Sequence, residues 1–388
     1  MGLSKTLAPL AVAFSAIAGM ANAEDTANDN FAFSCDTPDL SALSTPDLLD
    51  VIYPANVFIT VSAEMTMPFG LTPENGETPM GRAPGQGLGS GFVIDPRGYI
   101  VTNAHVLESG SGSADGKAFT VTFYDPDATN YMGQEVRAEL VGIDSSDAID
   151  LAILRVDVDA PLRCVNIADS DEVRVGERTF ALGNPMGHAF TYTEGVISHT
   201  RRSIGAPNRY HDYIQTDAAI NRGNSGGGLY SLDGRIVGVN TAIISSSGDS
   251  AGIGLAIPSN IVAETAHTLI TEGEIRRGWL GVQINEVDEQ AAASLGATEG
   301  TGVLITAVDP SGPSFGELEE SDIILSVNGN DVNTPLELIR QVSRVAPGEA
   351  AEFSVLRDGN IINLPIELGD RDAPAAAPTP APTPSPHP

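Results

Sequence analysis

Short runs of apolar residues separated by turn signals dominate residues 50–258. Phe119-Thr-Val-Thr-Phe-Tyr124 alternates with period two, as expected for a strand that has one face buried. Gly91–Ile94 and Tyr99–Thr102 flank Asp95-Pro-Arg-Gly98, a sequence typical of a type I turn with glycine in its last position. Many short strands with glycine-rich turns favour a β-barrel or β-sandwich over an α/β sheet.

A helix and a smaller unit follow. The helix is predicted at about 260–272, with Ser259 as its N-cap and Gly273 just past its end. A second helix begins at Thr334-Pro-Leu-Glu337, a capping box with proline at the first helical position. Strands are predicted near 302–308, 322–327, 351–357 and 361–367. The pattern predicts a small α+β domain.

The first 23 residues have the pattern of a secretory signal peptide. An apolar run from Leu7 to about Ala18 precedes Ala21-Asn-Ala23, which fits an A-x-A cleavage site. The alternative is an uncleaved membrane anchor, but Pro9 and Ser15 interrupt the run, which is shorter than the about 20 residues of a membrane span. We therefore expect an exported protein without a membrane anchor.

The two remaining segments are predicted to be flexible. Residues 24–48 contain acids and no bases, and the sixteen residues from Ala373 contain seven prolines. The predicted divisions are a signal peptide (1–23), an acidic arm (24–48), a first domain (49–258), a connector helix (259–275), a second domain (276–369) and a proline-rich tail (370–388).

The composition is that of a folding chain with a strong acid excess. Of 388 residues, 51 are Asp or Glu and 20 are Lys or Arg, which gives a formal charge of −31. Because nucleic acids and anionic membrane surfaces select for basic patches, neither is an expected partner. The cysteine and histidine spacings match no metal-binding pattern, so no metal site is predicted.

The chain contains two cysteines, Cys35 and Cys164. Export permits a disulfide, and only one intramolecular pairing exists. It would join the acidic arm to the first domain. Two free thiols and an intermolecular bond remain as alternatives.

The strongest chemical signal is Gly223-Asn-Ser225-Gly-Gly227. A serine between glycines can sit on a tight turn, with its hydroxyl exposed and backbone N–H groups free to bind an oxyanion. The alternatives are a plain glycine-rich loop and the nucleophile elbow of α/β-hydrolases. The elbow requires a preceding buried strand and a downstream histidine. Asp217–Arg222 is a poor strand, and the downstream histidines, His267 and His387, lie on the connector helix and in the tail.

The general base is therefore expected upstream of the serine. His105 follows the apolar strand Tyr99–Thr102, although a lone histidine there is commonly structural. Asp150 directly precedes the apolar run Leu151–Leu154, a position suited to orienting an imidazole. Asp144 and Asp147 are the competing acids and are interpreted as solvent-facing turn residues. Three other histidines are interpreted as solvated loop residues: His188, His199 and His211.

The order His105, Asp150, Ser225 is that of the chymotrypsin-type arrangement. Several stretches resemble the HtrA/Deg serine proteases: Thr102-Asn-Ala-His105-Val, Asp150-Leu-Ala-Ile-Leu, Ala181-Leu-Gly-Asn-Pro185, Gln215 to Gly227, Gly238-Val-Asn-Thr-Ala242 and Gly252 to Pro258. The resemblance covers about residues 50–369. It implies a mainly β fold, with a chymotrypsin-like double six-stranded β-barrel followed by a PDZ domain.

The resemblance also implies a mechanism without metal or cofactor. Ser225 is expected to attack the scissile carbonyl, His105 to carry the proton, and Asp150 to fix the imidazole tautomer. The backbone N–H groups of Gly223 and Ser225 are expected to form the oxyanion hole.

The same resemblance implies roles for residues around the active site. Asn240, Thr241 and Ala242 would pair with the substrate backbone, and Ile220 and Ile243 would lie near the specificity pocket. Cleavage after small or medium aliphatic residues is implied. Arg202 matches an arginine of the family's sensor loop, with a solvated loop cation as the alternative.

In the C-terminal domain, the resemblance assigns a carboxylate-binding loop for C-terminal peptides: Arg277, Gly278, Trp279, Leu280, Gly281 and Val282. It implies a periplasmic quality-control protease that acts on unfolded proteins and assembles as a homotrimer, or a larger particle, through residues 48–59. A regulatory protease with one signalling substrate and a non-catalytic chaperone or peptide-binding module are the alternatives.

Overall fold

The computed structural model describes Phe33, Cys35 and residues 40–63, 87–109, 113–114, 116–144, 149–204 and 213–371. Several predictions fall outside the described residues. They concern the signal peptide, most of the acidic arm, the tail beyond Arg371, and Asp147, His211 and His387. Within these ranges, every helix is too short or too polar to cross a lipid bilayer.

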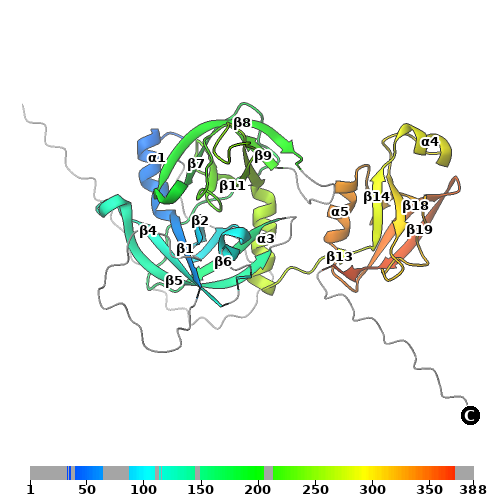
Figure 1. The fold of residues 1–388 in the computed structure, drawn as a ribbon, viewed down its shortest axis with the longest axis horizontal. Helices are drawn as coiled ribbons and strands as arrows, with labels where there is room; N and C mark the ends of the chain where they lie inside the picture. The colour runs from blue at the N-terminus through cyan, green and yellow to red at the C-terminus, as the bar shows by residue number, and fades with distance from the viewer. Residues whose placement is uncertain are drawn as a thin grey trace, which may run out of the picture. The chain divides into compact units, whose positions relative to one another are not determined.

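Six strands close into a first antiparallel barrel in the order β1-β2-β3-β6-β5-β4, coloured blue to cyan in Figure 1. They are β1 (Asn56–Ala63), β2 (Gly87–Asp95), β3 (Tyr99–Thr102), β4 (Lys117–Tyr124), β5 (Met132–Asp144) and β6 (Leu151–Val156). Strand β1 closes the barrel because it pairs with β2 on one side and β4 on the other. Its alternate residues Val57, Ile59 and Val61 are at most 1% exposed and form part of the barrel core.

A second antiparallel barrel, green in Figure 1, has the order β10-β11-β12-β9-β8-β7. Its strands are β7 (Arg178–Gly183), β8 (Thr191–Arg202), β9 (Tyr213–Thr216), β10 (Gly228–Ser231), β11 (Ile236–Ile243) and β12 (Gly254–Pro258). The predicted double six-stranded barrel is therefore confirmed. Short 3₁₀ turns lie at Tyr53–Ala55, Thr129–Tyr131 and Pro185–Gly187.

Helix α1 (Thr45–Ile52) precedes the first barrel and begins inside the segment predicted to be a flexible arm. The side chain of Ser44 caps it by accepting the Asp47 N–H. Leu48 and Ile52 are each 2% exposed. A Cβ at Gly234, in the β10–β11 turn, would lie 3.0 Å from Ile52, so α1 packs closely against this hairpin.

Helix α3 (Ser259–Glu272) follows the second barrel. Its predicted C-terminus is confirmed, because Gly273 adopts the left-handed conformation with φ of 80°. The predicted N-cap is wrong. Pro258 occupies that position, and the Ser259 hydroxyl instead donates to the Ala168 carbonyl at 2.7 Å.

The C-terminal unit is a sheet in the order β14-β15-β16-β18-β19, with β17 also paired to β16. Its elements are β13 (Gly278–Trp279), β14 (Val282–Glu286), α4 (Glu289–Leu295), β15 (Val303–Val308), β16 (Ile323–Val327), β17 (Asn330–Asp331), α5 (Pro335–Ser343), β18 (Ala350–Arg357), β19 (Asn360–Glu367) and β20 (Gly369–Asp370). Strands β13 and β20 form a separate pair. The four predicted strands and the Thr334 cap are confirmed.

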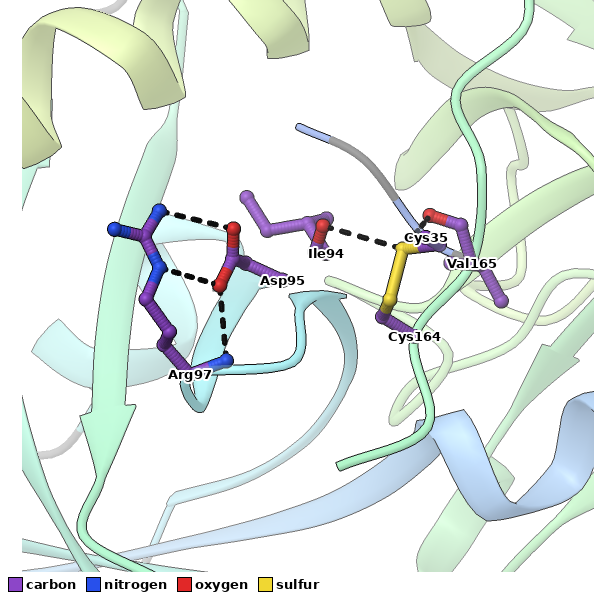
Figure 2. Close-up of a disulfide and its surroundings, with 6 residues drawn as sticks. All are labelled: Cys35, Ile94, Asp95, Arg97, Cys164 and Val165. Atoms are coloured by element: carbon purple, nitrogen blue, oxygen red, sulfur yellow. Dashed lines mark hydrogen bonds and ion pairs between the residues drawn. A yellow bond between two sulfur atoms is a disulfide. The ribbon is translucent and has the colours of Figure 1, made fainter. Parts of the chain in front are cut away.

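A disulfide joins Cys35 to Cys164, with the Cα atoms 5.6 Å apart (Figure 2). Both cysteines belong to the core of the first barrel, at 8% and 6% exposure. The Cys35 sulfur lies 3.3 Å from the Val165 carbonyl oxygen. Figure 2 also shows Arg97 paired with Asp95 in the predicted turn, where the Gly98 N–H donates to the Asp95 carbonyl at 3.1 Å.

Candidate active site

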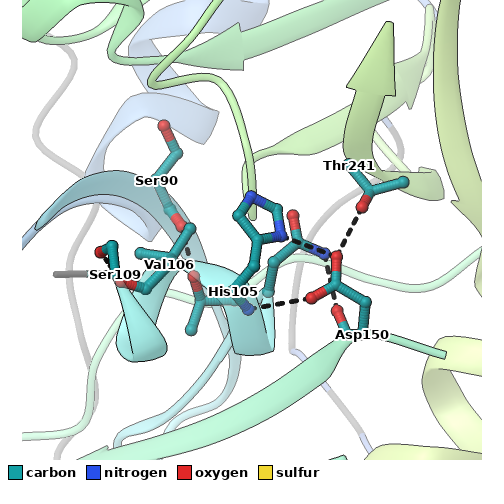
Figure 3. Close-up of polar contacts among 8 residues, drawn as sticks. Ser90, His105, Val106, Ser109, Asp150 and Thr241 are labelled. Carbon is teal, nitrogen blue, oxygen red and sulfur yellow. Dashed lines mark hydrogen bonds and ion pairs between the residues drawn. The ribbon is translucent and has the colours of Figure 1, made fainter. Parts of the chain in front are cut away.

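The imidazole of His105 and the carboxylate of Asp150 form a close pair (Figure 3). His105 lies on the short helix α2 (Ala104–Glu108), directly after β3, and Asp150 directly precedes β6. The Asp150 carboxylate accepts from the His105 ring at Nδ1 (2.7 Å) and from the His105 backbone N–H (2.9 Å). Since a carboxylate accepts the Nδ1 proton, Nε2 is the nitrogen free to take a proton.

Asp150 is itself held by groups from both barrels. Its carbonyl accepts from the Asn103 side chain at 2.8 Å, and its carboxylate accepts the hydroxyl proton of Thr241, on β11, at 2.7 Å. Its φ of 57° is left-handed, a costly conformation for a residue other than glycine. The acid is thus fixed by the meeting of the two barrels. No local sequence pattern signals this role of Thr241, which was not predicted.

The nucleophile loop, residues 223–227, can be formed only by glycines at its bends. Gly223 and Gly226 have φ of 103° and 83°. A Cβ on Gly223 would lie 2.3 Å from the Asn184 carbonyl oxygen, and one on Gly226 would lie 2.3 Å from the Thr102 hydroxyl. Gly226 thereby packs against the residues that lead into α2, which places Ser225 near the N-terminus of the helix that carries His105.

Each of the four peptide carbonyls from residue 222 to residue 225 accepts a hydrogen bond. The donors, in order, are the N–H of Met186 at 2.7 Å, the hydroxyl of Ser90 at 2.6 Å, the N–H of Gly227 at 2.9 Å and the N–H of Ser90 at 2.9 Å. The chain from residue 222 to residue 225 is therefore held at every carbonyl.

The N–H groups of the loop divide into two kinds. Those of Asn224 and Gly226 donate to backbone carbonyls at 3.0 and 2.9 Å. Those of Gly223 and Ser225 donate to no other residue that the structure describes. Because backbone N–H groups near the interior are almost always paired, two unpaired ones beside a nucleophile form a ready anion site. They are the two predicted for the oxyanion hole.

One link of the predicted triad is open. Within the described ranges, the Ser225 hydroxyl makes no hydrogen bond with His105. Nucleophile–base bonds are often long in ligand-free proteases and tighten with substrate.

The competing acid Asp144 was predicted to be solvent-facing. This prediction is wrong: Asp144 is 4% exposed and pairs with Arg277. No group of three His, Cys, Asp or Glu in the described ranges could hold a metal ion.

Two family descriptions match the chain, a trypsin-like peptidase domain over residues 89–239 and a PDZ domain over residues 278–368. A probable periplasmic serine endoprotease DegP-like from Rhizobium meliloti is 42% identical over 304 residues, which is 76% of this chain and 57% of the relative. A protein of the same description from Halomonas elongata is 40% identical over 73% of this chain and 56% of the relative. The chain spans little more than half the length of these curated relatives.

Solved structures match over nearly their whole length. The HtrA-type protease AlgW with a tripeptide is 34% identical, with a TM-score of 0.71, over 86% of this chain and 99% of that one. The chain belongs to the HtrA family of serine proteases. A serine endoprotease from Yersinia pestis is more distant, at 28% identity and a TM-score of 0.60, over 85% of this chain and 99% of that one.

The HtrA resemblance assigned Asn240, Thr241 and Ala242 to substrate pairing. Asn240 is fully buried, and its backbone N–H already donates to the Gly227 carbonyl at 2.9 Å. The Thr241 hydroxyl binds Asp150. Ala242 and Ile243 are half-buried, and Ile243 packs with Ile220 in one cluster of the second barrel. Of these residues, Thr241, Ala242 and Ile243 keep part of their surface exposed, whereas Asn240 does not.

Two basic side chains of this HtrA chain donate hydrogen bonds within the barrels. Arg202, the predicted sensor, ends β8 and donates to the Gln215 side chain at 2.8 Å. Lys117, 8% exposed, donates to the carbonyls of Leu107 and Ser109 at 3.1 and 3.2 Å, which end the helix carrying His105. Burial lowers the pKa of the Lys117 amine. This helix-capping role was not predicted from the sequence, where the rarity of lysine is the one signal, since Lys5 is the only other lysine in the chain.

The PDZ unit has a groove of about 550 Å³ between β14 and α5. Strand β14 is an edge strand, so its outer side is open to an added peptide strand. Five of the six residues predicted for peptide binding line the groove: Gly278, Trp279, Leu280, Gly281 and Val282. Arg277 is not among the lining residues, because its side chain is buried against Asp144.

Proposed function

We propose that this chain is a serine endopeptidase that hydrolyses peptide bonds of unfolded proteins. The single observation that carries the proposal is the nucleophile loop next to a His105–Asp150 pair, since the N–H groups of Gly223 and Ser225 donate to none of the other described residues. The family membership and the naming of the relatives as serine endoproteases support it.

In this mechanism Ser225 Oγ adds to the scissile carbonyl carbon, and its proton passes to His105 Nε2. The carbonyl oxygen becomes an oxyanion between the N–H groups of Gly223 and Ser225, where one donor accounts for about 10²–10³ in kcat. His105 then protonates the leaving amine, which departs. Water hydrolyses the remaining acyl ester with His105 as the base, and Asp150 stabilises the imidazolium in both halves.

The finer assignments rest on sequence and resemblance. The signal-peptide pattern and the relatives' description as periplasmic support action in the periplasm. The aliphatic surroundings of Ile220 and Ile243 favour small or medium aliphatic residues before the cleaved bond. A homotrimer is proposed to form through residues 48–59. A row of stacked rings supports this surface: Tyr53, which follows α1, stacks on Tyr124, and Tyr124 stacks on Tyr131, which is half-exposed.

A fluorophosphonate probe and unfolded casein test the proposed activity together. We expect the probe to label Ser225, as mapped by mass spectrometry, and casein to be degraded at a rate that the same probe abolishes. Ser225→Ala is expected to lose both signals. Absence of labelling and of cleavage, with and without C-terminal peptides, would instead identify a non-catalytic chaperone or peptide-binding module. Labelling without casein cleavage would favour the regulatory protease.

The PDZ groove is expected to bind hydrophobic C-terminal peptides. Ile339 lines the groove and is half-buried, so Ile339→Glu places a charge where an aliphatic side chain would dock. We expect an affinity loss of roughly 10- to 100-fold, the equivalent of one buried aliphatic contact. Fluorescence anisotropy of a labelled peptide ending in valine measures it.

Ile361→Glu is the matched control. Ile361 lies on β19, is 66% exposed and is not among the residues that line the groove. It adds the same charge to the same domain. Equal affinities for the two variants would contradict peptide binding in the groove.

A further inference from the structure

One buried side chain connects the two barrels directly at the nucleophile loop. Ser90, on β2 of the first barrel, is 1% exposed. Its hydroxyl donates to the Gly223 carbonyl at 2.6 Å and accepts from the backbone N–H and the side chain of Asn184 at 2.9 and 3.0 Å. A serine hydroxyl has one proton and two lone pairs, so its hydrogen-bonding capacity is completely used.

The backbone of Ser90 holds the same loop a second time. Its N–H donates to the Ser225 carbonyl at 2.9 Å, and its own carbonyl accepts from the Thr102 hydroxyl at 2.8 Å. Ser90 therefore binds the carbonyls of Gly223 and Ser225, and these belong to the peptide units on either side of the one that carries the Ser225 N–H.

This placement has a consequence for the oxyanion hole. The C=O and N–H of a trans peptide unit are fixed in one plane and point in opposite directions. When the flanking units are held by their carbonyls, the unit between them cannot rotate without breaking further hydrogen bonds. Gly223 would otherwise be free to move, because glycine tolerates a wide range of backbone conformations.

We propose that Ser90 is a positioning residue for the oxyanion hole: it anchors the carbonyls of Gly223 and Ser225, which fixes the peptide unit that carries the Ser225 N–H and restricts the glycine that carries the other N–H. The inference rests on the proposed peptidase function. Ser90 touches neither the substrate nor the reacting atoms, and acts through the backbone of the loop.

Ser90→Ala tests the role by removing the hydroxyl alone. We expect kcat for a chromogenic peptide to fall about 10- to 100-fold, less than the about 10²–10³-fold cost of deleting a whole donor. The KM is expected to change less than threefold, because substrate binding does not depend on the oxyanion. The affinity of a peptide boronic acid, which forms a tetrahedral serine adduct, is expected to fall by the same factor as kcat. The pH at which the rate falls on the acid side is expected not to move, because the His105–Asp150 pair is untouched.

Two further variants separate hydrogen bonding from packing. Ser90→Thr keeps the hydroxyl and adds a methyl group. The site is already crowded, because a Cβ built on Gly227 would lie 3.0 Å from the Ser90 Cβ. If the hydroxyl is what matters, Ser90→Thr retains more kcat than Ser90→Ala; if Ser90 only fills space, the order reverses and the proposal is overturned. Ser259→Ala is the control for general destabilisation, because Ser259 is a fully buried serine that donates to a distant carbonyl. Its kcat is expected to equal that of the wild type.

Hydrogen–deuterium exchange gives a readout independent of catalysis. In Ser90→Ala, the amide of Asn184, which donates to the Ser90 hydroxyl, and the peptide covering residues 221–228 are expected to exchange faster than in the wild type. Unchanged exchange and a kcat within twofold of the wild type would refute the anchoring role. If the wild type itself neither cleaves casein nor reacts with the fluorophosphonate, the proposed function fails, while the exchange comparison still tests the anchor.

Discussion

Asp150→Asn is expected to lower kcat about 10⁴-fold while the protein remains folded. Three donors converge on the Asp150 carboxylate: the His105 backbone N–H, the His105 ring at Nδ1 and the Thr241 hydroxyl. An asparagine offers one acceptor oxygen and places an NH₂ donor where the second oxygen was. The imidazole then accepts at Nδ1 and carries its proton on Nε2, so it cannot take the proton of Ser225.

The kcat and KM for a chromogenic peptide, together with the rate of fluorophosphonate labelling, measure this loss. Asp157→Asn is the matched control, since Asp157 directly follows β6, as Asp150 precedes it, and is exposed. The control is expected to keep the wild-type kcat. An Asp150→Asn variant within tenfold of the wild type would show that Asp150 does not orient the base.

Each of the three proposed catalytic residues has a local signal in the sequence. Ser225 lies between glycines, and His105 and Asp150 adjoin apolar strands, so residue type and position made them candidates. The resemblance to the HtrA/Deg proteases was needed to choose them over a plain glycine-rich loop and a structural histidine. The double barrel needed the resemblance, because alternation predicts strands without stating how a sheet closes.

The residues that sequence missed depend on partners far along the chain. Ser90 lies in a glycine-rich stretch that reads as a loop, since the predicted strand began at Gly91 and β2 begins at Gly87. Its partner Gly223 is 133 residues away. Asp144 was misread for the same reason, because the guanidinium that permits its burial belongs to Arg277, also 133 residues away. A buried polar group needs a partner, and tertiary structure alone supplies one at such separations.

Removal of the disulfide is expected to lower the free energy of unfolding by about 2–4 kcal/mol. The two cysteines are 129 residues apart, so the bond closes a long loop and removes many conformations from the unfolded chain. Both sulfurs lie in the core of the first barrel, where alanine fits without an unpaired polar group. We therefore choose Cys35→Ala combined with Cys164→Ala.

Guanidinium chloride unfolding, with and without a reducing agent, measures the effect. The wild type in reductant is expected to unfold at the midpoint of the double variant. The midpoint of the double variant is expected to be the same with and without reductant. Identical wild-type midpoints under both conditions would mean that the bond contributes nothing. Because thiols stay reduced in the cytosol, a bond that stabilises the fold also requires an oxidising compartment. Protein recovered from the cell envelope is therefore expected to contain no free thiol by alkylation and mass spectrometry, as export predicts.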